Sequence, residues 1–223
     1  MAIALREWRL WGQLVDDEPP NARPPPLPDD KPERVTGLWQ RVGEYWWLGM
    51  NADTPEAGWT GKHDAGGQVF LATRDETYAW SAAFISYVMR IAGAGPQFPY
   101  SATHATYINA AAEMSQEGSG QWALAAQAPQ AALPRQGDLI CFGRNGAGKM
   151  RFEELPAGPF ASHCDLVVAA SPGSLTVIGG NVDDAVTMKH VPTTPEGKLA
   201  DADGTPVDPR YPWFVVIRVL YER

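Results

Sequence analysis

The sequence predicts an α+β fold in which a helical first half packs on an antiparallel sheet of about five strands. Two observations predict this class. Apolar residues recur at helical spacing over the first half of the chain, and the second half holds short β-branched and aromatic runs between turn residues. A length of 223 residues suits one ordinary domain with long loops.

Helical spacing predicts four helices, over residues 3–14, from 32 or 33 to about 48, from 81 to near 93, and over 105–114. A proline-rich acidic connector, residues 16–32, follows the first helix and favours extended polyproline conformation, because proline cannot continue a helix. Residues 51–77 are polar and rich in glycine and threonine, and they predict a long loop before the third helix.

Five strands are predicted in the second half, over residues 139–142, 165–170, 175–181, 185–191 and 213–220. The turn Ser171-Pro172-Gly173-Ser174 predicts a tight hairpin between the second and third strands. We assign residues 1–50 to an N-terminal part and residues 51–223 to a main domain, and we expect both to pack as one structural unit.

Charge and hydropathy limit the partners and the cellular location. The formal net charge of −8 argues against nucleic acid or an anionic membrane surface as the main partner. No apolar run is long enough to span a bilayer, and the N-terminus lacks the basic start and apolar core of a secretory signal peptide. We expect synthesis in the cytoplasm, followed by function there or by export along a signal-independent route.

The two cysteines, Cys141 and Cys164, each lie within an apolar stretch, where cysteine usually acts as a small buried hydrophobe. The sulfurs would lie close together if the two stretches were neighbouring strands, but we expect free thiols. The four histidines are scattered and no paired cysteine or histidine spacing suits zinc, so we expect no metal and no cofactor.

Ser81 is the candidate nucleophile, because it stands at the start of the third predicted helix. The first turn of a helix has unpaired N–H groups and the positive end of the macrodipole, both of which favour a developing negative charge. The alternative is that Ser81 is simply an N-cap, since serine is among the best residues for that position.

Acyl transfer also needs a base and a group that orients the base. His163 stands at the start of the second predicted strand, and Asn181 stands at the end of the third, its expected neighbour. Ser81 could reach the His163 imidazole if its helix packed on that end of the sheet. The alternatives are a surface histidine at a strand edge and a turn asparagine after two glycines.

Four further residues are candidates for substrate binding. His104 is expected on the first turn of the next helix, where it could line a groove beside Ser81; the alternative is a surface or helix-capping histidine. Asp165 shares the strand face of His163 and is a reserve orienting group, with a solvated carboxylate as the alternative. Tyr78 could donate a hydrogen bond to an oxyanion, and Trp80 could stack on a ligand or pack in the core.

Four short segments follow one another in order: Trp80-Ser81-Ala82-Ala83-Phe84, Gly137-Asp138-Leu139-Ile140-Cys141-Phe142, Ser162-His163-Cys164-Asp165-Leu166-Val167-Val168 and Val177-Ile178-Gly179-Gly180-Asn181. The first resembles the Trp-Cys-Ala-Ala-Phe-type helix of CHAP and NlpC/P60 cysteine peptidases and amidases. The others resemble, in turn, the strands of those enzymes that begin with Gly-Asp, carry the histidine and end in the polar third residue. The chain as a whole resembles the DUF2272 group, which looks like a serine-bearing branch of this superfamily.

The resemblance implies a papain-like fold with Ser81 at the nucleophile position, His163 at the base and Asn181 at the orienting residue. Such enzymes cleave peptide or amide bonds, often in bacterial peptidoglycan. The departure is that a serine hydroxyl needs full general-base help, whereas a thiol is partly ionised near neutral pH.

Two functions therefore stay open. One is an amidase or endopeptidase of peptidoglycan peptides that uses a Ser-His-Asn triad. The other is an inactive papain-like domain that binds a peptide or glycan in its tryptophan-rich groove. A related hypothesis concerns delivery, as an antibacterial effector exported to the periplasm, with an immunity or secretion protein as its partner.

Overall fold

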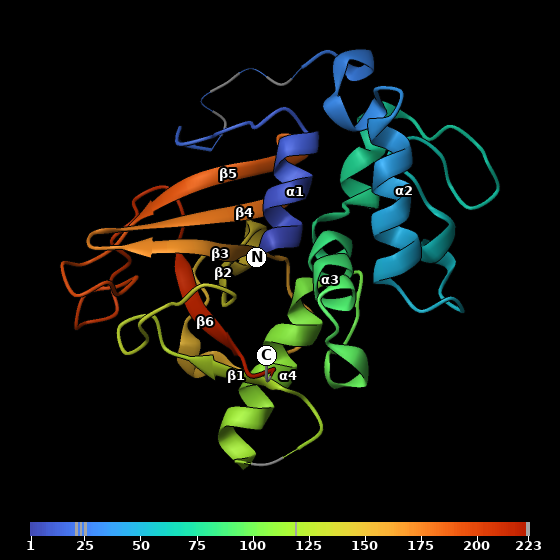
Figure 1. Ribbon diagram of the computed structural model, residues 1–223. Helices are drawn as coiled ribbons and strands as arrows, with labels where there is room; N and C mark the ends of the chain where they lie inside the picture. Colours follow the sequence, from blue (N-terminus) through green and yellow to red (C-terminus); the bar gives the residue numbers. More distant parts are fainter. Residues whose placement is uncertain (21, 23, 25, 119, 222–223) are drawn as a thin grey trace.

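The computed structural model describes residues 1–20, 22, 24, 26–118 and 120–221, and Figure 1 shows their arrangement. Four α-helices come first and a sheet follows, as the sequence predicts for an α+β fold. The helices are α1 (Ala2–Leu10), α2 (Leu38–Gly49), α3 (Ser81–Ile91) and α4 (His104–Glu117). Short 3₁₀ turns interrupt the connector and the long loop, at Pro28–Asp30, Pro32–Arg34, Pro55–Gly58 and Ala72–Tyr78.

A six-stranded antiparallel sheet forms the second half, with the strand order β1-β6-β2-β3-β4-β5. Its strands are β1 (Leu124–Gln127), β2 (Leu139–Gly143), β3 (Ser162–Ser171), β4 (Ser174–Val182), β5 (Ala185–Pro192) and β6 (Trp213–Val219). Five match the predicted strands. The sequence does not predict β1, because two of its four residues are alanines, which have low β-propensity. Pairing with β6 stabilises this strand in the sheet.

The sheet separates two apolar layers. On one side α1, α2, α3 and α4 share a core with inward-facing residues of the strands, such as Cys164 and Leu166 of β3. On the other side Val167 of β3 belongs to a second cluster, which residues from the loops after β1 and β5 help to close. Neighbouring residues of one strand therefore face different layers, as the pleat requires.

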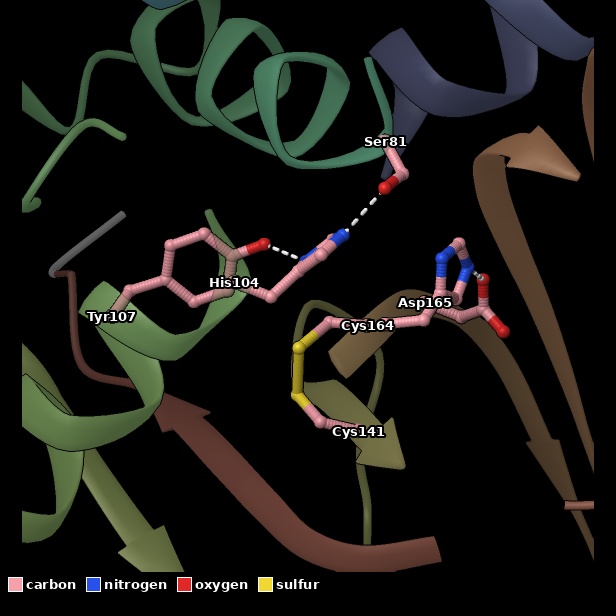
Figure 2. Close-up of a disulfide and its surroundings, with 7 residues drawn as sticks. Ser81, His104, Tyr107, Cys141, Cys164 and Asp165 are labelled. Atoms are coloured by element: carbon pink, nitrogen blue, oxygen red, sulfur yellow. Dashed lines mark hydrogen bonds and ion pairs between the residues drawn. A yellow bond between two sulfur atoms is a disulfide. The ribbon is translucent and has the colours of Figure 1, made fainter. Parts of the chain in front are cut away.

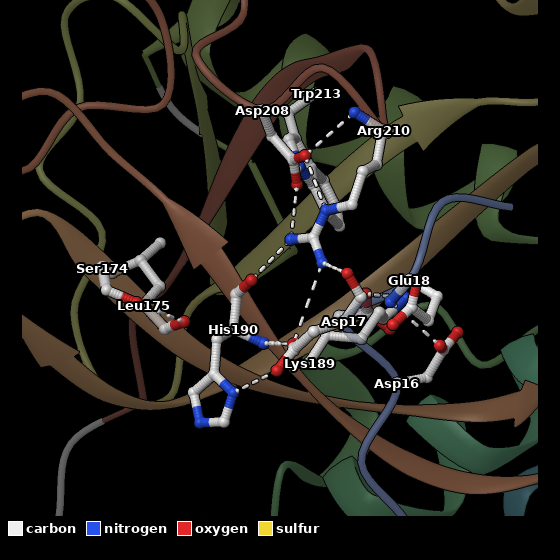
Figure 3. A network of polar contacts seen from close by, with 11 residues as sticks. Asp16, Asp17, Glu18, Ser174, Leu175, Lys189, His190, Asp208, Arg210 and Trp213 are labelled. Carbon is white, nitrogen blue, oxygen red and sulfur yellow. Dashed lines mark hydrogen bonds and ion pairs between the residues drawn. The ribbon is translucent and has the colours of Figure 1, made fainter.

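The N-terminal segment covers the outer edge of β5. Val15 bridges to Met188 in parallel, and the Asp16 N–H donates to the Met188 carbonyl oxygen at 2.9 Å. Figure 3 shows the next contacts, in which Asp17 accepts from the His190 N–H at 2.7 Å and Arg210 donates to the Asp17 carbonyl oxygen at 2.8 Å. An edge strand with unpaired N–H and C=O groups would otherwise invite pairing with another chain.

Helix α1 is anchored by the buried carboxylate of Glu7. Tyr45 of α2 donates a hydrogen bond to it at 2.7 Å, Arg41 of α2 does so at 2.7 Å, and Tyr87 of α3 does so at 3.1 Å. These partners stabilise a charge that would be costly to bury alone. Residues from α1, α2, α3 and the sheet form one hydrophobic cluster.

Two predicted helix boundaries are wrong. The first helix ends at Leu10 instead of residue 14, because the chain turns at Gly12 and Gln13, which both have positive φ. The second helix begins at Leu38 instead of residue 32 or 33, because Val35 is extended and Gly37 has a φ of 95°. Part of the predicted polyproline stretch, including Pro25, lies outside the described residues.

The prediction of free thiols is also wrong, because Cys141 and Cys164 form a disulfide. The two residues lie directly opposite each other on β2 and β3, and both side chains belong to the helix-side core. Only the strand pairing and its register bring the sulfurs together, so the local sequence could not reveal the bond.

We expect the variant with both Cys141→Ala and Cys164→Ala to lose about 2–4 kcal/mol of unfolding free energy, because the bond restricts the unfolded chain. Urea denaturation of the oxidised protein and of the variant measures the difference. Equal midpoints and slopes for the two proteins would show that the disulfide contributes nothing to stability.

Gly180 of β4 is a close-approach position, because a Cβ there would lie 2.5 Å from Cβ of Phe84 on α3. We expect Gly180→Ala to cost about 1–3 kcal/mol of unfolding free energy, the usual range for overpacking. Gly146→Ala is the matched control, because a Cβ at Gly146 meets nothing within 4 Å. The close approach is refuted if the two variants show the same denaturation midpoint.

Candidate active site

Three element starts converge to form the candidate site. Ser81 is the first residue of α3, His104 is the first residue of α4, and His163 is the second residue of β3. Figure 2 shows Ser81 and His104 pointing toward each other beside the first residues of β3. We use the term Ser–His cluster for Ser81, His104, Tyr107, His163, Asp165 and Lys189.

Ser81 is bonded to a histidine. Its Oγ lies 2.7 Å from Nε2 of His104, and Nδ1 of the same ring is hydrogen-bonded to the hydroxyl of Tyr107, one helical turn further along α4. Trp80 occupies the N-cap position of α3, without a side-chain cap bond, and Ser81 is the first residue within the helix. The alternative that Ser81 is only the N-cap of this helix is therefore wrong.

His163 has a different set of partners on the sheet. Its Nε2 lies 2.9 Å from Oδ1 of Asp165, and Oδ2 of Asp165 lies 2.7 Å from Nζ of Lys189 on β5. Alternation along β3 points His163 and Asp165 to the same face. The reserve orienting residue of the sequence analysis is therefore the group that binds the His163 ring.

The two halves of the Ser–His cluster meet through their imidazoles, because the ring centres of His104 and His163 lie 5.2 Å apart. Burial lowers the pKa of His104 well below 6.5, and the nearby His163 lowers it further. Burial also lowers the pKa of His163, although Asp165 opposes this shift. Both rings are therefore neutral at neutral pH.

Asp165 keeps its charge in this setting. Burial by itself would raise the pKa of Asp165, but Lys189 and His163 outweigh it and hold the pKa below 3.8. Burial raises the pKa of Tyr107 well above 10.0, so its hydroxyl stays protonated. The Ser–His cluster then contains a carboxylate, an ammonium and two neutral imidazoles.

Gly179 and Gly180 let β4 approach both halves of the Ser–His cluster. A Cβ at Gly179 would collide with Oδ1 of Asp165 and lie 3.0 Å from Nε2 of His163, whereas one at Gly180 would meet Phe84 of α3. The two positions face opposite sides of the sheet, one toward the His163–Asp165 bond and the other toward the helix that carries Ser81. The glycine pair thus sets how closely the helix and the sheet can pack at this site.

A family model for uncharacterised proteins conserved in bacteria, DUF2272, matches residues 33–219. The chain belongs to the DUF2272 family. The match contains every residue of the Ser–His cluster and begins after α1. No curated protein matches this DUF2272 chain, and no solved structure matches it either.

Asn181 does not hold the histidine that it was predicted to orient, because Asp165 is bonded to that ring. It has a φ of 55°, in the left-handed region that asparagine tolerates, at the irregular part of the β4–β5 pairing. Within the described part of the chain, the Asn181 side chain makes no hydrogen bond. In this geometry Asp165 occupies the orienting position, and Ser81 is bonded to His104 instead of His163.

Trp80 and Tyr78, the two aromatic residues predicted to contact a substrate, pack against other aromatic side chains of the protein. Trp80 is 1% exposed, stacks on Trp11 at 5.4 Å between ring centres, and donates its indole N–H to Glu33 at 2.5 Å. It is a core residue in this DUF2272 chain, so a ligand at the surface has no access to its ring. Tyr78 is half-buried and stacks on Phe70 with 4.0 Å between ring centres.

Two residues of the Ser–His cluster, Tyr107 and Lys189, were not predicted from the sequence. The spacing of Tyr107 could have indicated its role, because it follows His104 by three residues and so lies on the same helix face. The position of Lys189 could also have indicated a role, because it is a lone charge within an apolar strand, where only a buried partner can stabilise it. The identity of that partner depends on strand order.

Access to the reactive atoms is narrow. Ser81 and His104 are each 4% exposed and His163 is 3% exposed. Two surface hollows of about 250 and 240 Å³ lie elsewhere, one lined by α4 and residues 152–155 and the other lined largely by residues 148–153 and 203–214. Among the helices that the structure describes, none has the length and apolar character that a membrane crossing requires.

The buried histidines make stability depend on pH in a defined window. Both bind a proton more readily in the unfolded chain, so the unfolding free energy should fall as the pH drops below about 6.5, by up to about 1.4 kcal/mol per pH unit for each ring. Urea denaturation between pH 7.5 and 5.0 measures this slope. His104→Gln should reduce it, and an identical slope in that variant would contradict the assignment.

Proposed function

We propose that this member of the DUF2272 family is a hydrolase of amide bonds, with Ser81 as the nucleophile and His104 as its base. The observation that carries the proposal is the 2.7 Å contact between Ser81 Oγ and His104 Nε2 at the first turn of α3. A neutral imidazole in hydrogen-bond reach is what a serine needs to become nucleophilic.

The protons can be followed through both halves of the reaction. Oγ of Ser81 forms a bond to the acyl carbon while its proton passes to Nε2 of His104, and Nδ1–H of the same ring then donates to the Tyr107 oxygen. The C–N bond breaks and the amine leaves with the proton from Nε2. Water then attacks the ester, gives a proton to His104, and the ring returns it to Oγ as the acid leaves.

Negative charge on the acyl oxygen would be stabilised by the start of α3, where the first N–H groups have no partner within the helix. His163, the base predicted from sequence, takes a neighbouring role in this proposal. Because His163 stays neutral, it does not repel the positive charge that His104 carries after it accepts the serine proton.

The substrate that we propose is a peptide of bacterial peptidoglycan. Support comes from the resemblance of the segments around Ser81 and His163 to CHAP and NlpC/P60 enzymes. The disulfide between Cys141 and Cys164 adds to it, because in bacteria such bonds persist mainly outside the cytoplasm, where peptidoglycan lies. Export as an antibacterial effector, with an immunity or secretion protein as partner, is consistent with both points.

The second candidate function is binding without catalysis, of a peptide or a glycan. The low exposure of Ser81 and His104 favours it, because an acyl group can reach Oγ only if a neighbouring segment moves. In that case the Ser–His contact is a buried hydrogen bond that stabilises the junction of α3 and α4.

A fluorophosphonate probe separates the two functions. We expect covalent labelling of the wild type at Ser81, no labelling of Ser81→Ala, and labelling slowed at least about a hundredfold in His104→Ala, the scale of general-base catalysis. Mass spectrometry of the labelled peptide locates the adduct. Purified peptidoglycan fragments, analysed by liquid chromatography and mass spectrometry, test the substrate.

Ser86→Ala is the matched control, because Ser86 is also buried in α3 but donates to the carbonyl oxygen of Ser101 at 3.1 Å instead of to a histidine. It should leave labelling unchanged. Absence of labelling in the wild type, together with retained binding of peptidoglycan fragments, would reject the hydrolase and favour the binding module.

A further inference from the structure

Lys189 is a charged residue that is buried next to the serine–histidine pair, in the same cluster. It lies in β5 and is 1% exposed, and its ammonium sits among three aromatic rings of the second apolar layer. Nζ is 4.8 Å from the ring centre of Tyr211, 5.8 Å from that of Phe142 and 5.9 Å from that of Trp213. Ring faces attract a cation, which offsets part of the cost of burying it.

The ammonium has one anionic partner among the described residues, the fully buried carboxylate of Asp165, at 2.7 Å. A buried ion pair of this kind is seldom the most stable solution, since apolar residues of similar volume often do as well or better. Its position beside His163 suggests a role in the site.

We propose that Lys189 is a positioning residue of the Ser–His cluster, whose ammonium neutralises Asp165 so that the carboxylate binds His163 as a neutral imidazole. The inference rests on the proposed function of Ser81 and His104. In that function, Lys189 keeps His104 able to accept the serine proton. Of the two described side chains bonded to the buried Asp165 carboxylate, His163 would remain without Lys189, and it would then hold a proton as an imidazolium.

The charge of His163 matters because of its neighbour. The rings of His104 and His163 lie 5.2 Å apart, and a cation on His163 would oppose proton uptake by His104. The charged and titratable groups around His163 are Asp165 on its own strand, Lys189 on β5, His104 on α4 and Arg144 just after β2. Arg144 is exposed, so Lys189 is the cation that is buried with the carboxylate.

The hydrogen bonds also define which nitrogen of His163 is available. When Nε2–H donates to Asp165, Nδ1 carries the lone pair, and Nδ1 has no hydrogen-bond partner within the described part of the chain. Neutral His163 therefore presents an unprotonated nitrogen, whereas an imidazolium would present a second N–H. Lys189 thus acts on the protonation of the His163 ring in two ways, by its own positive charge and by neutralising Asp165.

The test is an NMR titration of the histidine side chains in the wild type and in Lys189→Met. We expect the pKa of His163 to rise by about one pH unit or more in the variant, because the unpaired carboxylate retains a proton on the ring. The double variant Asp165→Asn with Lys189→Met removes both charges and should return the pKa to the wild-type value or below. Lys189→Arg keeps the charge and should leave the pKa low.

Two results would overturn the inference: no rise in the pKa of His163 in Lys189→Met, or a rise that persists in the double variant, which would indicate altered packing. If Lys189→Met does not fold, Lys189→Gln makes the same comparison, because it keeps a donor for Asp165 without the charge. Fluorophosphonate labelling of Ser81 in the same samples reports the proposed function separately. In an active enzyme, Lys189→Met should slow labelling at least tenfold at pH 7 and move the acid limb of the pH profile upward.

Discussion

The ion pair between Asp165 and Lys189 is the constraint on which the arrangement of the candidate site depends. A carboxylate without solvent needs a cation and hydrogen-bond donors, and Asp165 obtains them from β5 and from its own strand. This requirement brings β3, β4 and β5 into fixed register near one end of the sheet. It also orients the His163 ring, since the bond to Nε2 leaves a single tautomer compatible with the carboxylate.

Close packing then carries the constraint from the sheet to the helices. The strand between β3 and β5 must pass over the His163–Asp165 bond and beneath α3 at consecutive residues, and only glycine leaves room for both contacts. Ser81 begins the helix that packs there, so the position of its hydroxyl follows from the approach of Phe84 to Gly180. The disulfide joins β2 and β3 at the residue next to His163, on the opposite face.

The resulting geometry differs from the arrangement predicted by resemblance in two partners. The serine is bonded to the histidine of α4, and the histidine of β3 is bonded to a carboxylate two residues away. Two neutral imidazoles in contact, backed by a neutralised carboxylate, can accept a proton from an alcohol without placing two cations side by side. In the proposed mechanism, such an arrangement would compensate in part for the lower reactivity of serine compared with a thiol.

The amino-acid sequence by itself determined the class of fold, the third and fourth helices and five of the six strands, because apolar periodicity and turn residues are local signals. It also singled out Ser81, His104, His163 and Asp165, whose residue types and places at element starts can be recognised without any contact. Only the tertiary structure decided which of them are partners: the bond from Ser81 to His104, the binding of His163 by Asp165 and not Asn181, and the disulfide. Those pairings depend on strand order, register and the approach of two glycines, and each of these is set by packing between residues far apart in the chain.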